Sequence, residues 1–289
     1  MGTGLPGTKR SDSGNMTQSM HVAPSAQQLA AWSRAYIESS VLTHKLAPPP
    51  FTEAGAEALG LPPPQGPGRP TELRVTWAKY KAPRSAHALM DVRKRAHLLH
   101  TFFHHELQAA ELLCWAVLRF PDAPLAFRRG LLNICLDEIR HMNAYAQRLR
   151  ELGFPLGSFE VRDWFWERAP AASTPAAFVA LMGLGFEAGN LDHARRFAQM
   201  LREAGDAASA TLQEQVGDEE VAHVAFGAHW FRELTGGLGF AAWCSALPPP
   251  LSPMVMRGSP LDRPRRAQAG FPADFLDALE AWVPESRGC

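Results

Sequence analysis

Two short motifs in the chain carry residue types that are typical of metal chemistry. Glu138 and His141 form one Glu-x-x-His sequence, and Glu220 and His223 form a second. Residues three apart lie on the same face of a helix, so each motif presents a carboxylate and an imidazole side by side. One such motif arises readily by chance, but two, each in a helical stretch, favour a shared metal site.

Each motif is preceded by an isolated glutamate. Glu106 lies 32 residues before Glu138, and Glu187 lies 33 residues before Glu220. The midpoint of the first pair is residue 122, at the Pro121–Asp122 break, and the midpoint of the second pair lies between residues 203 and 204, next to Gly205. Residues equidistant from the turn of an antiparallel helical hairpin lie at the same level, so each glutamate is expected to face its motif across its own hairpin.

All four glutamates fall on the apolar faces of their helices. Buried carboxylates that are ionised and unpaired are costly, and two divalent cations would supply the compensating charge. Four carboxylates and two imidazoles leave open positions on two metals, as in di-iron and di-manganese proteins. This hard donor set favours two iron ions over zinc and leaves an Mn/Fe or Mn/Mn pair open. The alternative is a set of buried salt bridges to arginine.

Residues beside the motifs are candidates for supporting roles. Asp137 and Glu219 each precede a motif glutamate, and each is expected to accept a hydrogen bond from the histidine of the other hairpin, with Arg140 holding one of the two carboxylates. The alternative is that they are surface acids. Tyr145, one helical turn beyond His141, is the candidate catalytic residue, either oxidised to a radical or gating the site; the alternative is a core aromatic with a hydrogen-bonded hydroxyl.

Other polar residues are weaker candidates. Glu111 lies about 140° around the helix from Glu106, on a face expected to be solvated or covered by an arm of the chain. His105 adjoins Glu106 but points elsewhere and is predicted to be structural, and His229 lies opposite Glu220 and is not expected to be a ligand. Small residues near the later ligands either leave room for a substrate or allow close helix packing: Gly183, Ala194, Gly217 and Gly227.

Four long helices must position these side chains, and they predict an all-α, ferritin-like four-helix bundle over residues 86–237. A disordered stretch (1–25) and a short helix (25–45) with a proline-rich arm (to 85) precede it, and a proline-rich extension (238–289) with a helix near 273–282 follows. The connection 154–172 and the C-terminal extension are candidate lids. The four helices are expected at 86–120, at 122–153 with Asp122 as N-cap, at 173–205 and at 206–236.

Composition excludes several classes of protein. The 289 residues contain 29 basic and 29 acidic side chains, which argues against a broadly basic nucleic-acid binder. Local clusters of basic residues are present all the same, and they include Arg93–Arg95, Arg128–Arg129, Arg195–Arg196 and Arg263–Arg266. No apolar run is long enough for a membrane span, and the N-terminus lacks a secretory signal. The four widely spaced cysteines are expected to be free thiols in a reducing cytoplasm.

Several segments resemble a bacterial ferritin-like family of unknown function. They are 104–112, 137–141 and 218–223, with 45–50 upstream and 266–271 downstream, so the likeness covers about residues 40–275. The resemblance implies a di-iron carboxylate centre on six residues: Glu106, Glu138, His141, Glu187, Glu220 and His223. More distantly, the chain is similar to the di-iron tRNA hydroxylase, to bacterial multicomponent monooxygenases and to the ribonucleotide reductase small subunit.

The function expected from these residues is a non-haem di-iron oxidoreductase that uses O₂ as co-substrate to oxidise or hydroxylate an organic molecule. Its substrate is a small molecule or a modified nucleoside, and it needs an external electron donor. A homodimer is left open, and no membrane partner is expected. The alternatives are a ferroxidase or metal-handling protein without an organic substrate, a tRNA-modifying hydroxylase, and a non-catalytic metal-sensing or partner-binding bundle.

Overall fold

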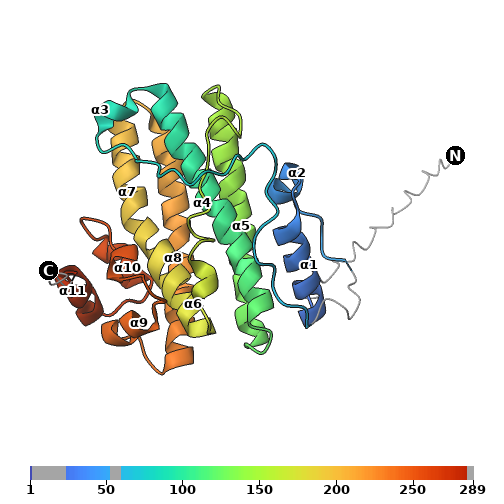
Figure 1. Cartoon of the computed structure of the whole chain (residues 1–289). Coiled ribbons are helices and arrows are strands. Elements are labelled where there is room, and N and C mark those ends of the chain that lie inside the picture. The colour runs from blue at the N-terminus through green and yellow to red at the C-terminus, as the bar shows by residue number, and fades with distance from the viewer. Residues whose placement is uncertain (2–23, 53–59, 285–289) are drawn as a thin grey trace.

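The computed structural model describes residue 1 and residues 24–52 and 60–284. Throughout this part the chain is all-α, as the sequence predicts (Figure 1). No sheet forms among the described residues; the extended segments meet only in an isolated parallel bridge between Val75 and Val161. In the same part of the chain, none of the helices combines the length and apolar character needed to cross a bilayer.

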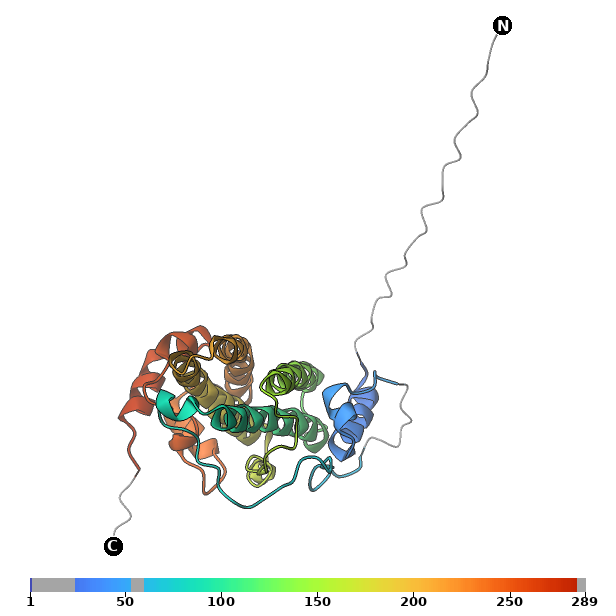
Figure 2. The ribbon, with the colours of Figure 1, turned by 90° about the horizontal axis from the view of Figure 1, so that it is seen from above.

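Four long helical rods run side by side through the middle of the molecule (Figures 1 and 2). Consecutive rods joined by short turns are antiparallel, so the first two rods form one hairpin and the last two form another. The rods are α4 (Val92–Arg119), α5 (Leu125–Glu151), the continuous α6 (Pro175–Leu181), η3 (Met182–Glu187) and α7 (Ala188–Glu203), and finally α8 (Ala207–Thr235).

The second hairpin has helix ends that follow directly from the sequence. Thr174 caps α6 by accepting a hydrogen bond from the backbone N–H of Ala177, and Asp206 caps α8 in the same way with Ser209. Gly236 ends α8 in a left-handed conformation, with φ at 81°, which glycine adopts without strain.

Two helix starts differ from those expected. Asp122 was expected to cap α5, but the helix begins immediately after Pro124, whose extended ψ of 136° delays the first turn and leaves the end without a side-chain cap. The single helix expected over 86–120 is divided into α3 (Ala86–Leu89) and α4. Asp91 makes the break, because its carboxylate accepts hydrogen bonds from the first backbone N–H groups of α4.

The third rod is not the uninterrupted helix expected over 173–205, because η3 is π-helical. Gly183 of η3 lies directly against α8, since a Cβ added to it would be 3.0 Å from the Cα of Gly227. Similarly, a Cβ on Gly217 would be 2.7 Å from that of Ala194. These four small residues therefore serve close helix packing, one of the two alternatives. Gly183 and Gly227 also line a small cavity of about 20 Å³ that includes Glu187 and His223.

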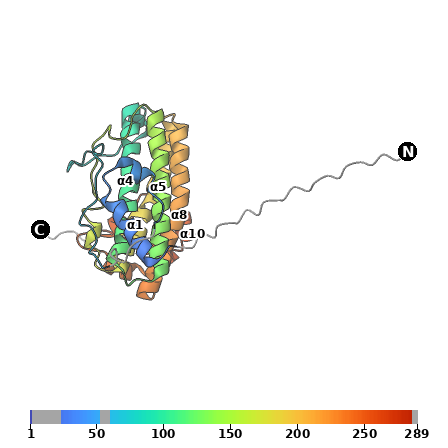
Figure 3. The same cartoon turned by 90° about the vertical axis from the view of Figure 1, so that its right-hand side faces the viewer.

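The N-terminal arm covers one flank of the rods. α1 (Ala26–Glu38) and α2 (Leu42–Leu46) pack against α4 and α5 (Figure 3). The sequence suggested one helix from residue 25 to 45, but the chain is non-helical at residues 39–41. Residues 2–23, which fall in the segment expected to be disordered, lie outside the described part of the chain.

The C-terminal extension covers the opposite flank (Figures 1 and 2). The helix expected near 273–282 is present as α11 (Ala273–Ala281), whereas α9 (Phe240–Ala246) and α10 (Arg263–Gln268) were not expected. A short 3₁₀ turn, η4 (Pro253–Val255), lies between α9 and α10, and another, η2 (Ala169–Ala171), precedes α6. The extension therefore folds as a helical layer onto the last two rods.

The cysteines are free where the structure describes them. Cys114 and Cys135 are buried at the α4–α5 contact, with their sulfur atoms 3.5 Å apart, and Cys244 is half-buried. Cys289 lies outside the described residues. Three of the four cysteines thus fit the free thiols expected from their spacing.

Candidate metal centre

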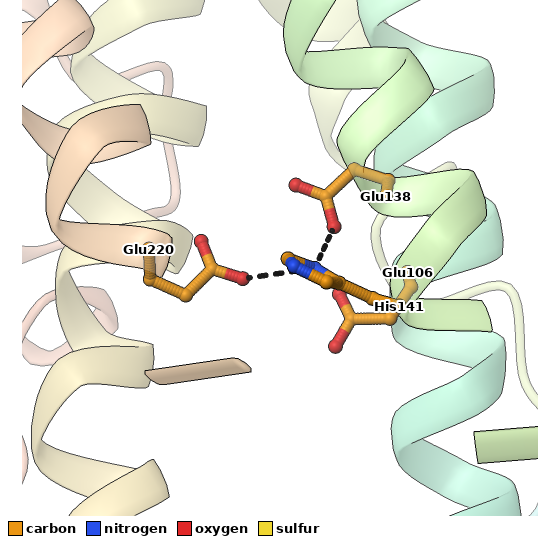
Figure 4. A group of neighbouring side chains, drawn as sticks. All are labelled: Glu106, Glu138, His141 and Glu220. Carbon is orange, nitrogen blue, oxygen red and sulfur yellow. Dashed lines mark hydrogen bonds and ion pairs between the residues drawn. The ribbon is translucent and has the colours of Figure 1, made fainter. Parts of the chain in front are cut away.

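Six ionisable side chains meet in the interior between the four rods. They come from every rod: Glu106 from α4, Glu138 and His141 from α5, Glu187 from the end of η3, and Glu220 and His223 from α8. None of the six residues keeps more than 7% of its accessible surface. Figure 4 shows four of them converging from three helices on one point. The structure therefore brings together all six residues that the motif spacing singled out.

The ligand atoms of these residues divide into two overlapping groups, and within each group they lie no more than 4.8 Å apart. The first group is Glu106, Glu138, His141 and Glu220, and the second is Glu138, Glu187, Glu220 and His223. Two glutamates thus belong to both groups, and each group adds one glutamate and one histidine of its own. This division fits two cations that share a pair of carboxylates.

Both histidines turn the same ring nitrogen toward the cluster. Nδ1 of His141 lies 3.1 Å from Glu138 Oε2 and 3.7 Å from Glu220 Oε1. Nδ1 of His223 lies 3.0 Å from an oxygen of each of these glutamates. The three-residue spacing of the Glu-x-x-His motif places the imidazole beside its own glutamate, and the neighbouring rod supplies the second contact.

The outward ring nitrogens are held by acids from the opposite hairpin. Nε2 of His141 lies 3.0 Å from Glu219, and Nε2 of His223 lies 3.3 Å from Asp137. Arg140 donates to both of these carboxylates, at 3.0 and 2.6 Å. With the proton on Nε2 donated to an acid, the lone pair on Nδ1 faces the cluster, which is the state that a metal ligand needs.

The carboxylates of the cluster have divided proton affinities. Burial, together with the charges of neighbouring glutamates, raises the pKa of Glu106 and of Glu187 well above the usual value. Burial acts in the same direction on Glu138, but the charge of His223 and a hydrogen bond from His141 outweigh it and hold the pKa of Glu138 well below its usual range. Without a cation, protons supply the positive charge of the site.

The histidines carry part of that charge. Burial alone lowers the pKa of His141, but the hydrogen bond that it donates to Glu138 and the charges of Glu138 and Glu220 prevail and raise it to about 9. The pKa of His223 is raised well above its usual value for the same reasons, with Asp137 adding a hydrogen bond. Protons therefore occupy positions that a cation would take.

The unsatisfied atoms of the cluster fit a divalent metal pair. Oε1 of Glu138 and Oε1 of Glu220 are buried and have no hydrogen-bond partner among the described residues; Oε1 of Glu138 is 3.0 Å from His223 Nδ1 but not aligned with it. Buried oxygens of this kind are unfavourable unless they are paired or coordinate a metal. Hard carboxylate oxygens with imidazole nitrogens suit iron or manganese.

Metal affinity is expected to rise with pH between about 6.5 and about 9. A cation must displace protons from His141, His223, Glu106 and Glu187, whose pKa values are all raised, so protons compete less as the pH increases. Competition titrations of Fe(II) or Mn(II) against a chelating dye at several pH values would measure this, with proton release at each addition. An affinity that is constant, or that falls with pH, would contradict it.

Loss of the outer hydrogen bonds is expected to weaken metal binding without unfolding the protein. Arg140→Ala frees Asp137 and Glu219 from their shared cation, so the histidines lose their fixed orientation, and metal affinity should fall roughly 10–100-fold. The same titration on Arg150→Ala, an exposed arginine of the same helix, is the control. Equal metal affinities in Arg140→Ala and Arg150→Ala would contradict the proposed role of Arg140 in orienting the histidines.

Tyr145 is fully buried, and its hydroxyl donates a hydrogen bond to Gln213 Oε1 at 3.0 Å. Burial, together with the charge of Glu106, raises its pKa well above the usual value, so the phenol stays protonated. The contacts are those of a core aromatic with a satisfied hydroxyl, which was the alternative to a redox role. His229, which was not expected to be a ligand, is exposed on α8.

Glu111 is buried under the N-terminal arm, one of the two positions expected for its face. Its carboxylate lies 2.8 Å from Lys45 Nζ and 2.7 Å from Arg69, and it accepts a hydrogen bond from the indole of Trp166. The fully buried Lys45 also donates to two backbone carbonyl groups of α1. This ion pair fastens the arm to α4, and no local pattern in the sequence identified Lys45 as its partner.

A cavity of about 330 Å³ adjoins the cluster, with Glu106 and Glu187 in its wall. Both segments that were expected as lids contribute to it: Trp164 and Phe165 from the connection between the hairpins, and Met254 and Val255 from η4. Sequence reasoning missed the polar lining of this cavity. His105, which was predicted to be structural, stacks on Phe165 at 4.9 Å and lines the cavity together with Asn190 and His193.

The fold and site define an all-α protein with a buried carboxylate–histidine cluster, which is a candidate metal site. The chain belongs to the DUF455 family, described as proteins of unknown function, whose family model matches residues 21–277. An uncharacterized protein of Haemophilus influenzae is 27% identical over 197 residues, which are 65% of this chain and 67% of that protein. No solved structure matches the chain.

Proposed function

We propose that this protein is a ferritin-like, di-iron carboxylate oxidoreductase that uses O₂ to oxidise or hydroxylate an organic substrate. The observation that carries the proposal is the pair of overlapping ligand groups that share Glu138 and Glu220. A salt-bridge cluster would need arginine or lysine beside the carboxylates, but the cations in contact with these glutamates are two histidines. Iron is the preferred metal because carboxylates dominate the donor set; manganese is the alternative.

The residues have distinct parts in the proposed centre. Glu138 and Glu220 would hold both ions, Glu106 and His141 one of them, and the remaining glutamate and histidine the other. The chemistry that a bound iron pair would supply is the four-electron reduction of O₂, with two electrons from the iron pair and two from the organic bond that is oxidised. Asp137 fixes the imidazole of His223 through its outward nitrogen, and Glu219 fixes that of His141 in the same way. The donor nitrogens are therefore positioned before a metal ion binds.

The cavity beside Glu106 and Glu187 favours an organic substrate over simple iron oxidation. Its volume of about 330 Å³ is in the range of pockets that hold small molecules, and aromatic side chains form much of its wall. The cavity reaches one unshared glutamate of each ligand group, so a substrate bound in it would lie beside both groups. An external electron donor belongs to the proposal, since each cycle consumes two electrons.

The described structure offers less support for a tRNA substrate. Such a substrate requires a positive surface, and the clustered arginines are the source that the sequence provides. Most of them are occupied within the fold: Arg95 with Asp206, Arg128 with the carbonyl of Val117, Arg129 with the carbonyl of Pro24, Arg263 with Asp277, Arg265 with Asp218, and Arg266 with Asp192.

The test is the stoichiometry of O₂ consumption. The protein is loaded anaerobically with two Fe(II) per chain and then mixed with O₂, with and without a large excess of free Fe(II). The proposal predicts consumption of about one O₂ per iron pair, unchanged by the excess until a reductant and an organic substrate are added. Glu220→Ala, which lacks a shared ligand, is the control and should consume none above background.

Two outcomes would contradict the proposal. O₂ uptake that continues in proportion to the excess Fe(II), with iron mineral as the product, would identify a ferroxidase. A loaded protein that consumes no O₂ at all would identify a metal-binding protein without oxidative activity.

A further inference from the structure

The cavity beside Glu106 and Glu187 continues outward into a second cavity of about 520 Å³. The two share five lining residues, so they are two parts of one groove: Phe102, His105, Trp164, Asn190 and His193. Residues of α4 and α7 form its sides, and the outer part is bounded by the arm around residues 76–82 and by the connection around residues 160–164. The residues that line this groove come from five separate segments of the chain.

The inner part of the groove has walls suited to a flat ring. Phe165 and Phe186 stack with their centroids 4.4 Å apart, and Trp164 lies 5.0 Å from Phe186. His105 stacks on Phe165, with ring centroids 4.9 Å apart, and extends this aromatic wall. Planar aromatic groups pack favourably against aromatic side chains of this kind.

One uncommitted polar group accompanies these rings. Asn190 is half-buried at the junction of the two cavities, and its side-chain amide makes no hydrogen bond to the described residues. An amide offers two donors and one acceptor, so it can recognise a polar edge of a ring or a substituent. Among apolar neighbours, a single group of this kind orients a ligand.

The outer part of the groove carries uncompensated positive charge. Lys79 and Arg196 are exposed there, and neither forms an ion pair with a described residue. Arg196 lies over the ring of Phe197, with its guanidinium carbon 4.7 Å from the centroid, and both residues line this part of the groove. Arg162 is paired with Glu167 at 2.7 Å, and Glu160 is the acid in this part of the lining. The two free cations therefore outnumber the one free acid.

We propose that this groove binds a small molecule with a planar aromatic group at its inner end, beside Glu106 and Glu187, and an anionic group at its outer end, on Lys79 and Arg196. The proposal rests on the proposed function only for the reaction that follows binding. The aromatic group would lie next to the ligands that face the cavity, and the anion would fix how far the molecule enters.

Isothermal titration calorimetry with 1-naphthyl phosphate tests this assignment on the full chain, both as purified and after removal of metal. Two relatives of the probe separate its features: 1-naphthol lacks the anion, and decanoate lacks the ring. We expect 1-naphthyl phosphate to bind more tightly than both. Arg196→Gln and Lys79→Gln should each weaken it by roughly 2–5-fold, as expected for a partly solvated ion pair.

Variants at the junction locate the binding site. Asn190→Trp fills the groove and should abolish binding of 1-naphthyl phosphate. If the larger residue prevents folding, Asn190→Leu, which keeps the size of the side chain, takes its place and should weaken the binding at least threefold. Arg195→Gln is the matched control, because Arg195 neighbours Arg196 on α7 but does not line the groove. Its affinity should equal that of the unmodified protein.

The outcomes separate this proposal from the proposed function. If the unmodified chain binds 1-naphthyl phosphate but takes up no metal, the groove is supported and the proposed oxidoreductase function is overturned. Absence of binding in a chain that holds two metals overturns the groove alone. Equal affinity for decanoate, equal affinity for 1-naphthol, or binding unaffected at Asn190 would each overturn the assignment of the substrate class.

Discussion

Glu138→Ala is expected to reduce the metal content of the protein from two ions per chain to none. Glu138 belongs to both ligand groups, so its removal takes one oxygen donor from each ion and leaves each with three protein ligands. It also removes the charge that keeps His141 and His223 in place through their Nδ1 atoms. The measurement is metal analysis of the purified, iron-loaded protein after dialysis.

Two further variants give that result its meaning. Glu106→Ala removes a donor from one group only, so it should keep one ion per chain. Glu233→Gln, an exposed acid on α8, should keep both. The helical content of all three proteins should match the unmodified chain, because loss of one carboxylate from a crowded acidic cluster also relieves repulsion and desolvation. Retention of two ions in Glu138→Ala would refute the assignment of shared ligands.

Arg266→Met is expected to destabilise the protein by about 3–5 kcal/mol, the range for removing one partner of a buried ion pair. Arg266 is fully buried and lies 2.8 Å from Asp192 on α7, and it donates to the carbonyl groups of Ala188 and Met256. The variant leaves Asp192 buried with only the backbone N–H groups of Gly258 and Asp262 as partners. Chemical denaturation followed by circular dichroism measures the free energy of unfolding.

Matched variants isolate the cause of that loss. Arg263→Gln changes a half-buried arginine of the same helix, whose ion pairs with Asp277 and Glu280 are partly solvated, and should cost less than about 1 kcal/mol. The double variant Asp192→Leu/Arg266→Met removes both charges and should be more stable than Arg266→Met alone. If Arg266→Met matched Arg263→Gln in stability, the buried pair would not be what holds the C-terminal extension to α7.

The residues of the candidate centre could be predicted from the sequence because two simple rules relate their positions. The helical repeat places His141 beside Glu138, and hairpin symmetry places Glu106 at the same level. Both rules act over one or two elements, so they need no knowledge of long-range packing. The helical repeat also indicated Asp137 and Arg140, because they immediately precede Glu138 and His141 in the same helix.

Features formed by distant segments were not accessible in this way. Lys45 and Glu111 meet across 66 residues, and only the path of the N-terminal arm brings them together. The groove at Asn190 is assembled from the arm, two rods, the connection and the C-terminal extension. The π-helical segment that ends at Glu187 was not predicted, because no local propensity signals it; its Gly183 lies against α8.

The most direct test of the account is anomalous diffraction from crystals of the protein purified without added metal, with data collected at the iron and manganese absorption edges. The account predicts two peaks per chain, roughly 3.5–4 Å apart, between Glu138 and Glu220, with one peak near Glu106 and His141 and the other near Glu187 and His223. Absence of both peaks after loading with Fe(II), with the carboxylates and imidazoles paired only to one another, would contradict it.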